Sequence, residues 1–248
     1  AVGSGVINDL CKLASHHLGK RYICIASAAS ADGYSTSGAA IVKDGSKQTF
    51  FCPAPLVIIG DSEILRNAPA RLTVAGYADL AAKIPAGGEW MIADLFGTEP
   101  IIPDAWHAIH DMLPELLEDA QAIADRTHKA VENLFAGLTM AGVAAQIANS
   151  TRPLSCADHL YSHILDMTHH TFEGRMVLHG FQVSVGTLTM CAFFDRLLKE
   201  DLTKLDVDAC VAAWPTKEQE IARATELFKN FPVPELGPTA VSYTHLRA

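Results

Sequence analysis

Short apolar runs separated by turn-forming residues fill the first sixty residues of the chain. Residues 7–18 carry apolar side chains at spacings of three and four, which predicts an amphipathic helix that ends at Gly19. Four further runs predict strands, two of which form a hairpin that turns at Asp44 and Gly45. The predicted strands cover residues 21–27, 38–42, 47–52 and 55–61. This alternation of helix and strand predicts an α/β unit.

After Asp61 the apolar residues recur every three or four positions almost without interruption, which predicts an all-helical second part. The predicted helices cover residues 71–84, 104–113, 114–150, 156–170, 179–200 and 216–231. We therefore place a domain boundary near residue 60, with an α/β domain over residues 1–60 and a helical domain over residues 61–240. Residues 241–248 have no periodicity and are interpreted as a non-native tail.

Five of the eleven histidines lie between residues 155 and 180. His159 and His163 are four residues apart and share one helix face, and a hairpin of two helices would return His179 to them. Asp79, among small apolar residues, is the candidate third ligand. Two imidazoles and a carboxylate with an open position are typical of a catalytic metal site. The alternative is that the histidines are ordinary surface or core residues and that Asp79 is an exposed acid.

Glycines before the first helix raise the possibility of a phosphate site. Gly3, Ser4 and Gly5 would let the backbone approach an anion at the helix N-terminus, although a simple turn fits the same residues. The full GxGxxG spacing of a dinucleotide-binding fold is absent from this stretch. Residues 27–36, which include Asp32, form a polar loop suited to a ribose, a nicotinamide or a polyol, or else an ordinary turn.

Several segments together resemble one family. The stretches GSGVIND, SAASADGY, AGYADLAAKIPAGGEWMIAD, TRPLSCADHLYSHILDM and LHGFQVSVGT have the order and spacing found in sn-glycerol-1-phosphate dehydrogenases. Those enzymes belong to the superfamily of iron-containing alcohol dehydrogenases, glycerol dehydrogenases and dehydroquinate synthases. The resemblance extends from residue 1 to about residue 235.

The resemblance implies a dehydroquinate synthase-like architecture, in which a nucleotide-binding α/β domain precedes a helical metal-binding domain and the active site lies between them. It implies metal ligands at Asp79, His159 and His179, and substrate contacts by Asp32, Asp79 and His163. His163 and Asp79 would be the catalytic residues. The implied cofactor-binding residues are Gly3, Ser4, Gly5, Val6 and Ile7 at the pyrophosphate, and Ser27, Ala28, Ala29, Ser30 and Thr36 at the nicotinamide.

The chain departs from the family pattern at a few positions. Ala29 and Ala31 replace a proline and a methionine, and Cys156 replaces a glycine ahead of His159. The family also carries further nucleotide-binding strands before the position of Ala1, so we expect this chain to be a fragment. Because that missing segment selects the 2′ group of the cofactor, NAD and NADP both remain open.

The resemblance implies reversible hydride transfer that reduces dihydroxyacetone phosphate to sn-glycerol 1-phosphate with NAD(P)H. A bound divalent metal would stabilise charge on the carbonyl oxygen, with zinc or nickel expected and iron also compatible. One alternative is a glycerol, polyol or alcohol dehydrogenase of the same superfamily. Another is a non-catalytic, truncated helical module.

Composition limits the kinds of molecule that the protein is expected to bind. The formal charge of −9 and the lack of a Lys/Arg-rich run argue against nucleic acid, and no uninterrupted apolar run is long enough for membrane insertion. The six cysteines include no CxxC pair, which is typical of a cytoplasmic protein. The expected partner is therefore a small phosphorylated polyol or ketose, and a homodimer is compatible with the resemblance.

Overall fold

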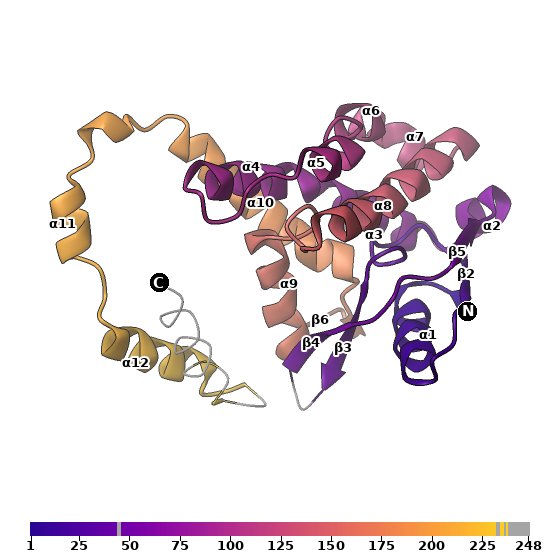
Figure 1. Cartoon of the computed structure of the whole chain (residues 1–248), viewed down its shortest axis with the longest axis horizontal. Helices are drawn as coiled ribbons and strands as arrows, with labels where there is room; N and C mark the ends of the chain where they lie inside the picture. The colour runs from indigo at the N-terminus through magenta and orange to yellow at the C-terminus, as the bar shows by residue number, and fades with distance from the viewer. Residues whose placement is uncertain (44–45, 232–233, 236, 238–248) are drawn as a thin grey trace.

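The computed structural model describes residues 1–43, 46–231, 234–235 and 237. The N-terminal part contains a parallel sheet in the order β1-β2-β5, with helix α1 (Gly5–His17) connecting its first two strands, and a separate antiparallel hairpin of β3 and β4 (Figure 1). The strands are β1 (Val2–Gly3), β2 (Ile23–Ala26), β3 (Gly38–Lys43), β4 (Ser46–Phe51) and β5 (Val57–Gly60). The four predicted strands are confirmed, whereas β1 was not predicted. The predicted Asp44–Gly45 turn lies outside the described residues.

Side chains alternate across the parallel sheet as the pleat requires. Cys24 and Ala26 of β2 face the interior, where they pack with Tyr34, Leu65 and Val131. Ile23, on the other face of β2, and its neighbours Val57 and Ile59 on β5 are 43 to 46% exposed. The sheet therefore joins the rest of the molecule through one face only.

The rest of the described chain is mainly helical. The helices that follow the sheet are α2 (Ser62–Asn67), α3 (Ala70–Ala81), α4 (Lys83–Leu95), α5 (Pro103–Ile109), α6 (Leu113–Leu117), α7 (Ala120–Ala124) and α8 (His128–Ala148). The later elements are α9 (Ala157–Met167), the hairpin of β6 (Thr171–Phe172) and β7 (Arg175–Met176), α10 (His179–Leu197), the 3-10 turn η1 (Leu202–Lys204), α11 (Val207–Ala212) and α12 (Lys217–Phe228). Helices α11 and α12 lie away from the other helices in Figure 1, and α11 has no buried residue.

Two sequence-based expectations about these helices are wrong in detail. The predicted helix 114–150 is three helices, because Asp119 caps the start of α7, Thr127 caps the start of α8, and Arg126 between them has a left-handed φ of 53°. The expected all-helical second part also contains the β6–β7 hairpin. Its turn residues Glu173 and Gly174 have φ values of 51° and 72°.

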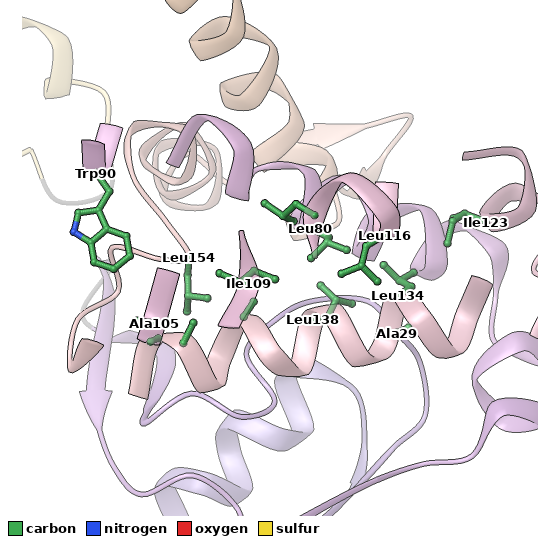
Figure 2. Close-up of a cluster of buried hydrophobic side chains, with 14 residues drawn as sticks. Ala29, Leu80, Trp90, Ala105, Ile109, Leu116, Ile123, Leu134, Leu138 and Leu154 are labelled. Atoms are coloured by element: carbon green, nitrogen blue, oxygen red, sulfur yellow. The ribbon is translucent and has the colours of Figure 1, made fainter. Parts of the chain in front are cut away.

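Helix α8 is the centre of the main core. Figure 2 shows its Leu134 and Leu138 among side chains from other helices, including Leu80 of α3 and Leu116 of α6. By length and composition α8 is the one helix among the described residues that could cross a membrane. Its residues Leu134 and Leu138 have no exposed surface, so these two apolar side chains belong to the protein core.

Candidate metal centre

Three helices from distant parts of the sequence bring the predicted ligands together. Asp79 lies on α3, His159 lies on α9, and His179 is the first residue of α10. One ligand atom from each of these residues lies within 4.8 Å of the other two. Asp79 is fully buried and His159 is 7% exposed. This juxtaposition is the arrangement that the sequence analysis predicted.

The close approach of α10 to its neighbours requires two glycines. A Cβ on Gly180 would lie 1.9 Å from the carbonyl oxygen of Ala75 in α3, and a Cβ on Gly186 would lie 2.3 Å from the carbonyl oxygen of Asp158 in α9. Any side chain at either position would push these helices apart. The glycines therefore let α10 pack against both other helices that carry the candidate ligands.

His159 is oriented by the acid that precedes it. Its Nδ1 lies 3.1 Å from Oδ1 of Asp158, and its Nε2 lies 3.5 Å from Oδ1 of Asp79. Burial opposes the charged imidazolium, but these two carboxylates outweigh burial and raise the pKa of His159 to about 9. A carboxylate at Nδ1 leaves Nε2 directed at Asp79, which is the orientation a metal-ligating histidine needs.

His179 is oriented by neutral partners. Its Nδ1 lies 2.9 Å from the hydroxyl of Ser162, which in turn donates a hydrogen bond of 2.8 Å to Oε1 of Gln182. Burial lowers the pKa of His179 to about 3, so its imidazole is neutral. A neutral ring has a lone pair available, and the Ser162 contact at Nδ1 leaves Nε2 for a cation.

Asp79 shares its two oxygens among three partners. Oδ2 accepts a hydrogen bond of 3.0 Å from the backbone N–H of Asp32, and Oδ1 accepts one of 3.0 Å from Nζ of Lys83. Burial alone would raise the pKa of Asp79, but the ammonium of Lys83 and the contact with His159 lower it well below its usual range. The carboxyl group of Asp79 is therefore an ionised ligand donor.

The substrate-binding candidates Asp32 and His163 have different surroundings: Asp32 contacts Asp79 and Lys83, whereas His163 lines a cavity that does not include Asp32. Asp32 is 8% exposed and its Oδ2 lies 2.5 Å from Nζ of Lys83. Burial and the nearby charge of Asp79 raise the pKa of Asp32. His163 is outside the three-residue cluster, and it lines a cavity of about 400 Å³ together with His159. Burial and the charge of Lys47 lower the pKa of His163 to about 4.

The cavity beside His163 has a mixed electrostatic character. Its charged lining residues are Glu89, Glu99 and Arg152, and Nη2 of Arg152 lies 2.8 Å from Oε2 of Glu99. Glu89 accepts hydrogen bonds from the backbone N–H of Ala157 at the start of α9. The one arginine is thus paired, and the α9 N-terminus is capped by an acid.

The predicted cofactor-binding residues follow two neighbouring parallel strands. Gly3 to Ile7 run from the end of β1 into α1, and Ser27 to Ser30 follow β2, so both segments lie at the carboxyl edge of the sheet. The second segment adjoins α3, since a Cβ on Gly76 would lie 2.1 Å from the carbonyl oxygen of Ala29. The two segments are therefore neighbours of each other, and the second one also lies against the helix that carries Asp79.

Thr36 at the far end of this loop is held by a buried lysine. Nζ of Lys12 donates to Oγ1 of Thr36 at 3.1 Å and to the carbonyl oxygens of Gly33 and Gly38 at 2.8 Å each. Burial lowers the pKa of Lys12. Lys12 fixes the course of residues 33–38 from helix α1.

Sequence reasoning missed Lys83, Asp158, Ser162 and Lys12. Lys83 follows Asp79 by four residues in an otherwise apolar stretch, and Asp158 directly precedes a candidate ligand, so both had a detectable signal. Ser162 and Lys12 have small or flexible polar side chains, and their partners lie on other elements. Only the folded structure reveals them.

The donor set fits a divalent transition metal. Two imidazole nitrogens and one ionised carboxylate suit zinc, nickel or ferrous iron, and three protein donors leave a position open. Hydrogen-bonding partners at the Nδ1 atoms of His159 and His179 are the outer contacts that such sites use. The residues present therefore fit the metal that the resemblance implies.

The chain is similar to known proteins over most of its length. The family profile described as iron-containing alcohol dehydrogenase matches residues 1–69. A glycerol-1-phosphate dehydrogenase of Halalkalibacterium halodurans is 33% identical over 194 residues, which are 78% of this chain and 49% of that protein. Another from Pyrococcus furiosus is 33% identical over 208 residues, 83% of this chain and 59% of that protein. Residues 1–69 therefore resemble the iron-containing alcohol dehydrogenases, and most of the chain is similar to about half of each of these two relatives.

Solved structures agree with the fold of this chain. The glycerol dehydrogenase of Schizosaccharomyces pombe matches with a TM-score of 0.58 and 22% identity, over 78% of this chain and 50% of that one. A 2-deoxy-scyllo-inosose synthase matches with a TM-score of 0.55 and 17% identity, over 84% of this chain and 53% of that one. The predicted α/β and helical architecture is thereby confirmed. The chain spans about half the length of the relatives it matches.

Proposed function

We propose that the whole protein is a metal-dependent NAD(P)H oxidoreductase that reduces dihydroxyacetone phosphate to sn-glycerol 1-phosphate, in a reversible reaction. The observation that carries the proposal is the approach of Asp79, His159 and His179 to within 4.8 Å, next to the two loops at the carboxyl edge of the sheet. The names of the relatives from Halalkalibacterium halodurans and Pyrococcus furiosus support the substrate.

In this proposal Asp79, His159 and His179 hold one divalent cation. Such a cation supplies Lewis acidity, which favours negative charge on a carbonyl oxygen during hydride transfer. The backbone N–H of Asp32 donates a hydrogen bond to Asp79. The carboxyl group of Asp32 accepts a hydrogen bond from a substrate hydroxyl in this proposal. These residues orient the substrate, and the nicotinamide supplies the hydride.

His163 moves the proton in this proposal. Because its pKa is lowered to about 4, its imidazole is neutral near pH 7 and can accept the proton of the substrate hydroxyl in the alcohol-oxidising direction. The same ring returns that proton in the reducing direction. The cavity of about 400 Å³ that it shares with His159 is large enough for a small substrate.

The cofactor is proposed to lie along the carboxyl edge of the sheet. Gly3 and Ser4, together with the first turn of α1, offer backbone N–H groups and a helix N-terminus to the pyrophosphate. The segment Ser27–Ser30, with Thr36, lies between β2 and α3 and would hold the nicotinamide end. In this proposal the hydride donor lies beside the candidate metal ligands.

One observation favours a second candidate, a polyol dehydrogenase that acts on an unphosphorylated substrate. The cavity beside His163 has two glutamates and one arginine, and that arginine is paired with Glu99. His159 also lines this cavity, but its ring is paired with Asp158 and Asp79, so the lining offers no unpaired positive charge to a phosphate. A phosphorylated substrate therefore needs a cationic group from elsewhere in the whole protein.

Steady-state oxidation kinetics of the whole protein separate the two candidates. We expect kcat/KM for sn-glycerol 1-phosphate to exceed that for glycerol by at least about a hundredfold, since a site built for a charged group discriminates strongly against an analogue without it. Equal or higher kcat/KM for glycerol would favour the polyol dehydrogenase. Running both substrates with NAD and with NADP assigns the cofactor.

A further inference from the structure

Lys83, the first residue of α4, is a buried cation that the proposed reaction does not use. Its side chain has no exposed surface, yet its Nζ lies 3.0 Å from Oδ1 of Asp79 and 2.5 Å from Oδ2 of Asp32. Burial opposes the charge of the ammonium group, and the two carboxylates in contact with Nζ compensate it. Lys83 therefore carries a positive charge between a candidate metal ligand and a candidate substrate-binding residue.

The ammonium group shares an oxygen with the candidate metal centre. Oδ1 of Asp79 accepts from Lys83 and also lies 3.5 Å from Nε2 of His159. The other oxygen, Oδ2, is held separately by the backbone N–H of Asp32. A cation bound by Asp79 and His159 would therefore share Oδ1 with the ammonium of Lys83.

We propose that Lys83 is a positioning residue that holds Asp79 and Asp32 in place and limits the affinity of the centre for a divalent cation. The inference rests on the proposed metal site and adds to it a residue that controls its charge. The formal charges of the two carboxylates and the ammonium sum to −1. Without Lys83 the two carboxylates alone carry −2. In the metal-free protein the ammonium compensates charges that would otherwise repel each other in a buried site.

Two opposing effects decide the sign of a substitution at Lys83. Removing the ammonium deprives Oδ1 of Asp79 of one contact, which disorders the ligand, but Oδ2 keeps its backbone hydrogen bond from Asp32. Removing the ammonium also deletes a positive charge within a few ångströms of the metal position, where electrostatic repulsion is only weakly screened. We expect the charge effect to dominate, because Asp79 retains an anchor.

Cobalt(II) titration of the 248-residue chain, followed by visible absorption, tests this inference without any catalytic turnover. We expect Lys83→Met to bind cobalt at least about tenfold more tightly than the wild type. The same variant without metal should unfold at a lower temperature, since two buried carboxylates lose their counter-ion. Lys83→Gln carries the same charge change with a side chain that can still donate hydrogen bonds, and gives the answer if Lys83→Met does not fold.

The double variant Lys83→Met/Asp32→Asn is the matched control, because it restores the net charge of −1. Its cobalt affinity should return to within about threefold of the wild type. The inference is overturned if Lys83→Met binds cobalt no more tightly than the wild type does. It is also overturned if the double variant binds cobalt as tightly as the single variant. If the wild type binds no cobalt, the metal-dependent function and this inference both fail. If the wild type binds cobalt and the Lys83 variants bind it with the same affinity, only this inference fails.

Discussion

Each candidate histidine ligand has one partner at Nδ1, and the two partners differ in charge. His159 lies against the carboxylate of Asp158, whereas His179 lies against the hydroxyl of Ser162. Burial lowers the pKa of His179, whereas at His159 the carboxylates of Asp158 and Asp79 outweigh burial and raise the pKa. Metal binding would therefore displace a proton from the ring of His159, whereas the ring of His179 is already neutral and would lose none.

The carboxylate behind His159 can be tested by Asp158→Asn. The amide oxygen can still accept a hydrogen bond from Nδ1, but it loses the charge that makes the imidazole a stronger donor to a metal. We expect cobalt affinity to fall about 10- to 100-fold, as for outer-contact residues at other metal sites. Isothermal titration calorimetry measures the change. Asp208→Asn on the exposed helix α11 is the control and should bind as the wild type does.

At the scale of elements, the packing of α10 against α3 and α9 determines whether the ligands meet. Two glycines make this packing possible, and helix propensity alone would disfavour both of them. Gly186 lies next to Asp158, so its lack of a side chain affects the helix that carries His159. A change in helix spacing should therefore reduce folding stability and metal binding together.

Gly186→Ala tests that link. The new Cβ would lie 2.3 Å from the carbonyl oxygen of Asp158, so α9 and α10 must separate. We expect the free energy of unfolding to fall by about 1–3 kcal/mol and cobalt affinity to fall with it. Urea denaturation and cobalt titration measure the two effects. Gly5→Ala, whose Cβ would meet no atom of the described residues within 4 Å, should leave the stability unchanged or slightly higher.

His110 at the end of α5 provides a pH test of packing between elements. Its ring stacks on Trp106 with centroids 4.0 Å apart, and its Nε2 is buried with no partner among the described residues. Burial lowers the pKa of His110 from 6.5 to about 4. As pH falls from 6.5 to about 4, the unfolded chain takes up a proton that the folded protein resists. The free energy of unfolding should therefore decrease over this range.

The variant His110→Phe keeps an aromatic ring on Trp106 and removes the titrating group. Between pH 7 and pH 5 it should lose less stability than the wild type, which urea denaturation at each pH measures. The difference between the two proteins isolates His110 from the other titrating histidines. If both proteins lose the same free energy of unfolding between pH 7 and pH 5, His110 is not held as a neutral ring in the folded protein.

At the scale of the whole molecule, the N-terminal hairpin contacts the helix that carries His159 and His163. Nζ of Lys47 on β4 lies 2.8 Å from Oδ2 of Asp166 on α9, and both side chains are mostly buried. Burial opposes the charge of Asp166, but Lys47 lowers its pKa below the ordinary value. This ion pair connects segments 119 residues apart in the sequence.

A double-mutant cycle with Lys47→Met and Asp166→Asn measures that connection. We expect a coupling energy of about 1 kcal/mol at pH 7, because the pair is partly shielded from water. Since the folded pKa of Asp166 is depressed, its contribution is present above pH 4 and is lost as pH falls through the folded value. A coupling that is zero at pH 7, or that persists unchanged at pH 2, would show that the pair does not join these segments.

Sequence periodicity could predict the strands β2 to β5 and most helices. Spacing made His159, His179 and Asp79 candidates, and the family resemblance singled them out as one set of ligands. Periodicity could not predict β1, which is two residues long and depends on pairing with β2. Helix α4 was missed because Pro85, Gly87 and Gly88 have low helix propensity, although Pro85 lies in the first turn, where it is tolerated. Lys83 was missed because its role comes from tertiary contacts with two acids. The expected tail 241–248 lies outside the described residues.

The central claim is that one divalent cation binds between Asp79, His159 and His179. Crystals of the chain grown with zinc, with anomalous diffraction measured at the zinc edge, test it most directly. The account predicts an anomalous peak within about 2.0–2.2 Å of a carboxylate oxygen of Asp79 and of one nitrogen of each histidine. A zinc peak elsewhere, with none between these three residues at saturating zinc, would contradict the account.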